Sequence, residues 1–203
     1  MMSRTLAILF VAIGLFRPAL SHAGAIKDPI ADFIATESAI EWGKYKDISR
    51  VQVDLNRDGR KIVFLSNSYV RHAGMAWTVY LPARRGYTRV LTNLTEEDMP
   101  CFMPENCHVG YIPEIKHRGI VFFLGRDVDG ISFFAFWVED GKARVKQIGH
   151  TKPARNDSEP DDPLFRKYFP DLENPNRKPP FAMETLSMDD LRAKGYAISK
   201  IDP

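Results

Sequence analysis

The sequence predicts a mainly β protein with helical elements at its margins. The expected fold is an antiparallel meander of about seven strands, curled or sandwich-like, with an N-terminal helix and a short C-terminal helix. Short runs that alternate, or that are rich in β-branched and aromatic residues, recur between residues 51 and 148, as is typical of strands. Asp-Gly and similar turns separate these runs. These short turns leave no room for the crossover helices that parallel strands require.

The N-terminal residues have the pattern of a secretory signal peptide. Arg4 supplies a positive start, Leu6 to Phe16 is an apolar run of 11 residues, and Ala23-Gly-Ala25 offers a small-residue cleavage site. The apolar run is shorter than the roughly 20 residues that a membrane-spanning helix needs, and no later stretch approaches that length. We therefore expect residues 1–25 to be removed and the protein to be periplasmic or secreted. Retention as an uncleaved anchor is the alternative.

Removal of residues 1–25 leaves a chain without net charge. The full sequence has 28 Lys and Arg residues against 26 Asp and Glu residues. The removed segment carries Arg4 and Arg17 and no acidic residue, so 26 basic residues face 26 acidic ones. A nucleic-acid partner is not expected, because such proteins carry a clustered basic excess. The remaining length suits one domain with its own core.

The β core and the N-terminal helix are expected to occupy residues 26–149. In the helix, Asp28 has the position of an N-cap and Pro29 that of the first helical residue, and apolar residues follow at helical spacing up to Gly43. Residues 51–66 read as a hairpin. Further strands are predicted over 76–81, 87–91, 109–115, 120–124, 131–138 and 143–148.

Residues 150–185 form a Pro-rich arm that is expected to pack on the core. Seven of the chain's 14 prolines lie between His150 and Phe181, a density that favours extended chain over helix or strand. Yet Phe165 and Phe169 are unusual for a disordered linker. We expect the arm to run over the sheet and to bury these aromatic side chains.

Residues 186–203 are expected to complete the same domain with a short helix and a final strand. Ser187 and Asp190 have the spacing of a capping pair at the start of a helix. Gly195 has the position of the residue that ends one. The final strand is predicted over residues 196–201.

Two cysteines, Cys101 and Cys107, lie in the short sequence CFMPENC. In an oxidising compartment this spacing predicts a disulfide that closes a small loop, which Pro104 already bends. His108 follows directly, so we also considered a metal or haem site. The spacing fits neither the C-x-x-C-H haem signature nor a common zinc site.

A candidate cation loop lies at the tip of the first hairpin, in Asp54-Leu-Asn-Arg-Asp-Gly59. Asp54, Asn56 and Asp58 would offer side-chain oxygens at positions one, three and five of a D-x-N-x-D-G calcium loop, and Arg60 its backbone carbonyl at position seven. The alternative is a plain turn in which these side chains bond the backbone.

The segment from Val51 to Leu81 resembles calcium-loop proteins of the EF-hand-like or FG-GAP and integrin-like type, as found in exported bacterial proteins of unknown function. The resemblance implies Ca²⁺ as a ligand of the loop. The sequence departs from the EF-hand pattern at Ile62 and Leu65, which stand at positions nine and twelve where oxygen ligands are usual.

No catalytic motif is recognisable. H-E-x-x-H, G-x-S-x-G, S-x-x-K and phosphate-binding glycine loops are all absent from the sequence. A triad assembled by the fold stays open, because triads are defined by geometry. The histidines that follow the signal segment are His72, His108, His117 and His150.

The expected function is therefore an exported, non-enzymatic binding module for a protein or another envelope component, by analogy inhibitor-like or immunity-like. The loop around Cys101 and Cys107 and the Pro-rich arm are its expected contact surfaces. Two alternatives stay open. One is a secreted hydrolase with a loop-built site that uses His72 or His108, and the other is a calcium-stabilised structural domain.

Overall fold

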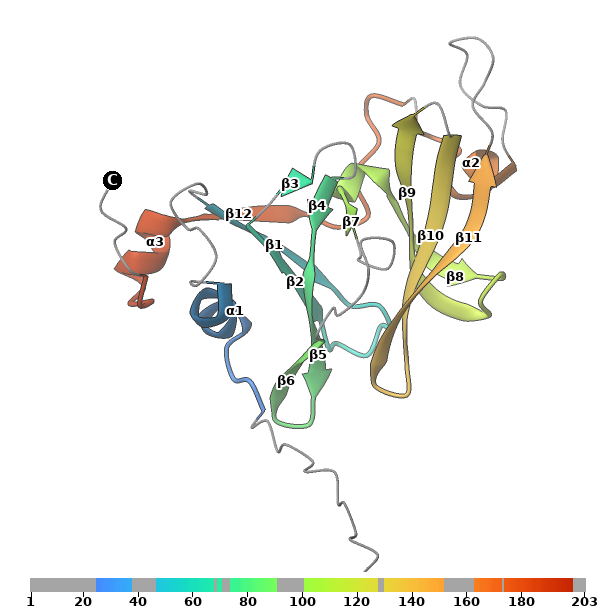
Figure 1. The fold of residues 1–203 in the computed structure, drawn as a ribbon. Helices are drawn as coiled ribbons and strands as arrows, with labels where there is room; N and C mark the ends of the chain where they lie inside the picture. The colour runs from blue at the N-terminus through green and yellow to red at the C-terminus, as the bar shows by residue number, and fades with distance from the viewer. Residues whose placement is uncertain are drawn as a thin grey trace, which may run out of the picture.

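The computed structural model describes residues 25–37, 47–67, 69–70, 74–90, 101–127, 130–151, 163–172 and 174–198. Two antiparallel sheets of five and four strands pack face to face, with helices on the outer side of each (Figure 1). The predicted fold class is confirmed. Among the described helices, none is long and apolar enough to cross a membrane.

The first sheet has the strand order β12-β1-β2-β5-β6. Its strands are β12 (Met183–Ser187), β1 (Asp47–Val53), β2 (Ile62–Ser66), β5 (Thr78–Ala83) and β6 (Gly86–Val90). The predicted hairpin is present, with Val53 opposite Ile62. Helices α1 (Pro29–Glu37) and α3 (Met188–Ala193) cover the outer face of this sheet.

The second sheet has the order β11-β10-β9-β8. Its strands are β8 (Cys107–Ile112), β9 (His117–Asp127), β10 (Gly130–Glu139) and β11 (Lys142–Thr151), and helix α2 (Pro163–Tyr168) lies on its outer face. A third, small sheet contains β3 (Tyr69–Val70), β4 (Gly74–Ala76) and β7 (Cys101–Phe102), and the 3-10 turn η2 (Pro104–Asn106) follows it.

Three apolar layers explain why these residues form these elements. β2 is buried along its whole length because its two faces serve different layers. Phe64 points between the two sheets, whereas Val63 and Leu65 pack under the helices. β10 alternates in the same way, with Phe136 between the sheets and Phe133 under α2. A strand buried on both faces reads as a continuous apolar run, as both of these do.

The two predicted helix caps are present. The Asp28 carboxylate accepts the backbone N–H of Ile30 at 2.9 Å. The Ser187 hydroxyl accepts the backbone N–H of Asp190 at 3.1 Å, and Gly195, with φ of +87°, follows α3. These bonds satisfy N–H groups that have no partner within the helix.

Several elements were not predicted. β12 pairs with β1 at the edge of the first sheet, and α2 forms inside the arm. The short elements β3, β7 and η2 were also not predicted. Conversely, residues 196–198 are not a strand, and the rest of the strand predicted over 196–201 lies outside the described residues. β12 escapes recognition because most of its side chains are exposed or half-buried, which removes the alternation that marks a strand.

Candidate functional site

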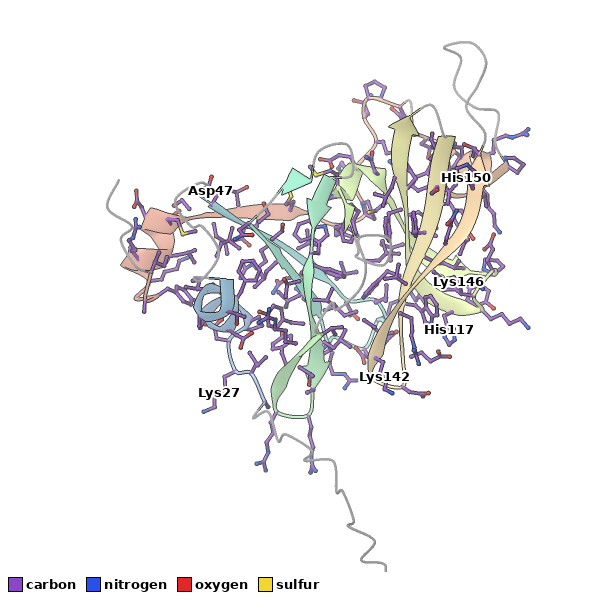
Figure 2. All side chains as sticks on the ribbon, in the orientation of Figure 1. Lys27, Asp47, His117, Lys142, Lys146 and His150 are labelled. Carbon is purple, nitrogen blue, oxygen red and sulfur yellow. The ribbon has the colours of Figure 1, made fainter. Side chains whose placement is uncertain are left out.

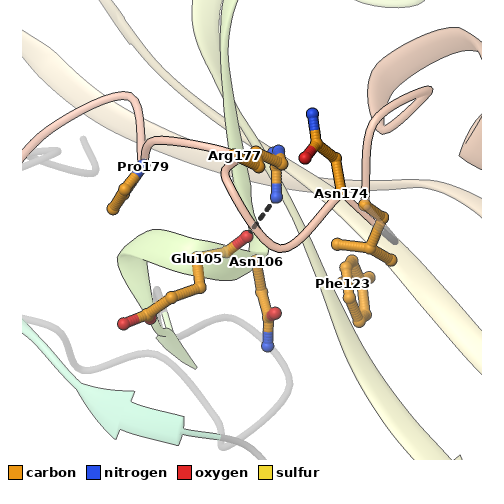
Figure 3. Close-up of a pocket in the computed structure, with 7 residues that line it drawn as sticks. Glu105, Asn106, Phe123, Asn174, Arg177 and Pro179 are labelled. Atoms are coloured by element: carbon orange, nitrogen blue, oxygen red, sulfur yellow. Dashed lines mark hydrogen bonds between the residues drawn. The ribbon is translucent and has the colours of Figure 1, made fainter.

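A cavity of about 380 Å³ lies where the arm crosses the turn η2 and strand β9 (Figure 3). We call it the arm cavity. Its volume is at the small end of the range found for ligand pockets, about 300–1,000 Å³. It is lined by Glu105, Asn106, Phe123, Leu172, Asn174, Arg177 and Pro179.

Arg177 ties the arm to the turn. One terminal nitrogen of its guanidinium donates to the Glu105 carbonyl, and the other donates to the Cys107 carbonyl at 2.9 Å. The guanidinium carbon also lies 5.7 Å from the ring centre of Phe169. These three contacts hold the side chain in place, so its charge is preorganised at the cavity.

The other lining groups divide into polar and apolar ones. Phe123 is buried and Leu172 is half-buried, and they give the cavity an apolar side. Asn174 accepts the backbone N–H of Asn176 with its side-chain oxygen at 2.9 Å, which leaves its NH₂ group as the free donor. The amide of Asn106 makes no hydrogen bond to a described residue. The cavity therefore combines amide donors, the cation of Arg177, the carboxylate of Glu105 and an apolar surface.

The predicted bond between Cys101 and Cys107 is not present, which corrects the sequence-based expectation. Cys107 is a buried free thiol that donates to the Met103 carbonyl at 3.3 Å. Burial raises the pKa of this thiol well above its usual range, although the nearby charge of Arg177 opposes the shift. Cys107 opens β8 in the second sheet, whereas Cys101 belongs to β7 in the third sheet. Arg177 instead bonds the carbonyls of Glu105 and Cys107 at the end of this segment.

The candidate cation loop is held by its own hydrogen bonds. The two carboxylate oxygens of Asp54 accept the backbone N–H groups of Asp58 at 3.1 Å and Gly59 at 2.9 Å. Asp58 accepts the backbone N–H of Arg60 at 2.9 Å and pairs with its guanidinium at 2.8 Å. These bonds lower the pKa of Asp58. A cation at Asp58 would have to displace the Arg60 side chain, so the ligand set fits calcium only after that rearrangement.

The histidines do not converge on one site. His72 lies outside the described residues. His108 is half-buried on β8, with its ring 5.5 Å from that of Tyr168. His117 bonds Glu139 at 3.0 Å, and His150 bonds Ser132 at 3.0 Å, at opposite ends of the second sheet (Figure 2). Within the described ranges, no three His, Cys, Asp or Glu side chains are grouped as for a metal ion.

The pKa of His108 gives the protein an expected sensitivity to mild acid. Burial lowers this pKa, and the charges of Arg177 and Arg118 lower it further. An unfolded chain titrates its histidines near pH 6.5. At a pH just below 6.5, the unfolded state binds a proton at His108 that the folded state does not bind. The free energy of unfolding should therefore fall as the pH is lowered below about 6.5. His108→Gln is expected to reduce the loss between pH 7 and pH 5, measured by urea unfolding. His150→Gln is the matched control, and an unchanged loss in His108→Gln would contradict the prediction.

Arg177 and the arm cavity were missed from the sequence. The arm was expected to dock, but nothing in Asn174-Pro-Asn-Arg177 indicates that its arginine reaches two carbonyls about 70 residues earlier in the chain. The available signal was weak, because Arg177 is one of six Lys and Arg residues in the segment expected to pack against the sheet.

The comparisons with known proteins add no further assignment. No family model matches the chain, and no curated protein or solved structure is significantly similar to it.

Proposed function

We propose that the chain is an exported, non-enzymatic binding module that holds its partner at the arm cavity. One observation carries the proposal: the two segments expected to make contacts, the loop before Cys107 and the Pro-rich arm, line the same cavity. Arg177 joins them across a separation of 70 residues. A rigid sandwich that presents loops around a small polar cavity is a common arrangement for recognition.

The location follows from the signal pattern. With residues 1–25 removed, the protein acts in the periplasm or outside the cell, where its partner is a protein or another envelope component. An inhibitor of an envelope enzyme or an immunity protein is a role of this kind. Mass spectrometry of the protein from its native host should find an N-terminus near residue 24 or 26. An intact residue 1 would contradict export with cleavage.

The binding role is tested by closing the cavity. Asn174 is exposed at its rim, so Asn174→Trp should fill the opening with little effect on the core. Thr185→Trp places the same side chain on exposed β12 and serves as the control. Immobilised wild-type protein and Thr185→Trp should retain the same component of an envelope extract, and Asn174→Trp should lose it. Equal retention by all three proteins would contradict a role for the cavity.

A second function, hydrolysis, is favoured by the pair of Ser132 and His150. Ser132 Oγ and His150 Nδ1 lie 3.0 Å apart on neighbouring strands, the arrangement in which an imidazole takes the proton of a nucleophilic hydroxyl. A fluorophosphonate probe, from which the serine oxygen would displace fluoride, should then label the wild type and not Ser132→Ala. Absence of label in the wild type would contradict hydrolysis by this pair.

Stabilisation by calcium is a third proposal, supported by the resemblance of the loop at Asp54, Asn56, Asp58 and Arg60. A site with a Kd near 1 mM would add about 1.4 kcal/mol in 10 mM calcium, a rise of a few degrees in Tm. Arg60→Gln should enlarge this rise, because it removes the cation that pairs with Asp58. Asp54→Ala should abolish it. An identical Tm in calcium and in chelator for wild type and Arg60→Gln would contradict calcium binding.

A further inference from the structure

We propose that the arm cavity recognises its ligand by a carboxylate group attached to a short apolar group. This inference rests on the proposed binding function and specifies its ligand class. It depends on three features of the cavity: a cation that forms no ion pair with a described residue, free amide donors beside it, and an apolar side.

The cation is Arg177. Two N–H groups of its guanidinium donate to backbone carbonyls, which carry no net charge. Within the part of the chain that the structure describes, Arg177 forms no ion pair with a carboxylate. Its effect on its surroundings is visible at His108, whose pKa it helps to lower. A fixed guanidinium with donors to spare prefers an oxyanion, because charge-assisted hydrogen bonds are about twice as strong as neutral ones.

The amides and the apolar side define the rest of the ligand. Asn174 is oriented by the N–H of Asn176, so its NH₂ group is the part left to donate. Figure 3 shows Arg177 between Asn174 and Asn106, with Phe123 beside Asn106 and below Asn174 in this view. A ligand whose carboxylate pairs with Arg177 can therefore place an apolar group against Phe123.

Glu105 favours a carboxylate over a phosphate. Its side chain lines the same cavity, and its negative charge helps to raise the pKa of the Cys107 thiol. Repulsion from this carboxylate grows with the charge of the ligand, so a phosphate, which carries more than one negative charge on average near pH 7, is opposed more than a carboxylate with one charge. Arg177 can neutralise one negative charge.

The inference is tested by titrating the ¹⁵N-labelled protein with four probes. Isovalerate represents a free small acid, and N-acetyl-alanyl-alanine a peptide C-terminus; the amide of that dipeptide and inorganic phosphate are the comparisons. At least one of the two carboxylate probes should shift the backbone signals of residues 105–107 and 174–179. The dipeptide amide and phosphate should bind at least about tenfold more weakly than that probe, a loss of about 1.4 kcal/mol. The carboxylate probe that binds identifies the source of the carboxylate, either a free small acid or a peptide C-terminus.

A matched pair of variants tests the charge argument without disturbing the turn. Asn174→Asp keeps the oxygen that accepts the N–H of Asn176 but adds a negative charge at the cavity. It should lower the affinity for the carboxylate probe about tenfold or more, with an unchanged Tm. Asn174→Ser removes the NH₂ donor without adding the charge, so it should weaken binding of the carboxylate probe clearly less than Asn174→Asp does.

The results separate this inference from the function on which it rests. Binding of the dipeptide amide or of phosphate as tight as that of the better carboxylate probe, or no shift with either carboxylate, would overturn the carboxylate assignment. So would equal binding by Asn174→Asp and Asn174→Ser. The binding function itself fails if the wild type retains no extract component, or if Asn174→Trp retains the component that the wild type retains.

Discussion

Replacement of Phe102 by alanine is expected to lower the free energy of unfolding by about 3–5 kcal/mol. Phe102 is 1% exposed and lies between the two sheets. Its ring contacts Phe64 at 5.5 Å and Trp77 at 5.3 Å between ring centres. Its carbonyl also accepts the Trp77 indole N–H at 3.0 Å. The truncation removes apolar contacts and leaves a cavity among rings that cannot collapse into it.

Urea unfolding of Phe102→Ala measures this loss, and Tyr111→Ala is the matched control. Tyr111 is also an aromatic residue of the sandwich, but it is 60% exposed. Its truncation should change the free energy of unfolding by no more than about 0.5 kcal/mol. Similar losses in both variants would show that the inter-sheet layer does not dominate stability.

Phe169→Ala is expected to release the arm and to remove ligand binding, with a loss of about 3–5 kcal/mol if unfolding is cooperative. Phe169 is 3% exposed. It packs edge-to-face on Phe123 with ring centres 5.1 Å apart, and the Arg177 guanidinium lies over its ring. Without the ring, both the apolar anchor of the arm and one support of Arg177 are lost. Urea unfolding measures the loss, and limited proteolysis within the arm reports its release.

Tyr168→Phe is the control for Phe169→Ala. The Tyr168 hydroxyl donates to the Glu114 carboxylate, so this variant loses a hydrogen bond but keeps the ring. It should lose about 1.5–3 kcal/mol, as expected for a hydrogen bond to a charged group, and keep the arm protected. If Phe169→Ala were as resistant to proteolysis as Tyr168→Phe, the arm would have to be anchored elsewhere.

The elements that could be predicted are those whose determinants are local. Alternation in β1, the apolar run of β2 and the caps of α1 and α3 are all contained in short segments, and the structure has these elements close to their expected ranges. The hairpin of β1 and β2 was predictable because turn residues connect strands adjacent in the sequence. Fold class could be inferred from the number of such units.

The remainder depends on partners that are distant in the sequence. β12 is a strand because its backbone pairs with β1, where Thr185 stands opposite Ser49 and Glu184 pairs with Arg50. α2 docks where Gly149 leaves room, since a Cβ atom there would collide with the Leu164 side chain. The arm cavity also depends on distant partners, because nothing in the sequence around Arg177 indicates which two carbonyl groups it bonds. None of these contacts alters the residues' own periodicity, so pattern analysis does not detect them.

The position of β12 has a consequence for the order in which the protein folds. β1 is near the start of the described chain, yet one of its two neighbours is near the end. Chains are synthesised from the N-terminus, so β1 presents an unpaired edge until residues 183–187 emerge. Such an edge invites pairing with other chains, and closing it late requires a contact of high sequence separation, which slows folding. The nascent chain is thus exposed to aggregation through β1 until its last strand arrives.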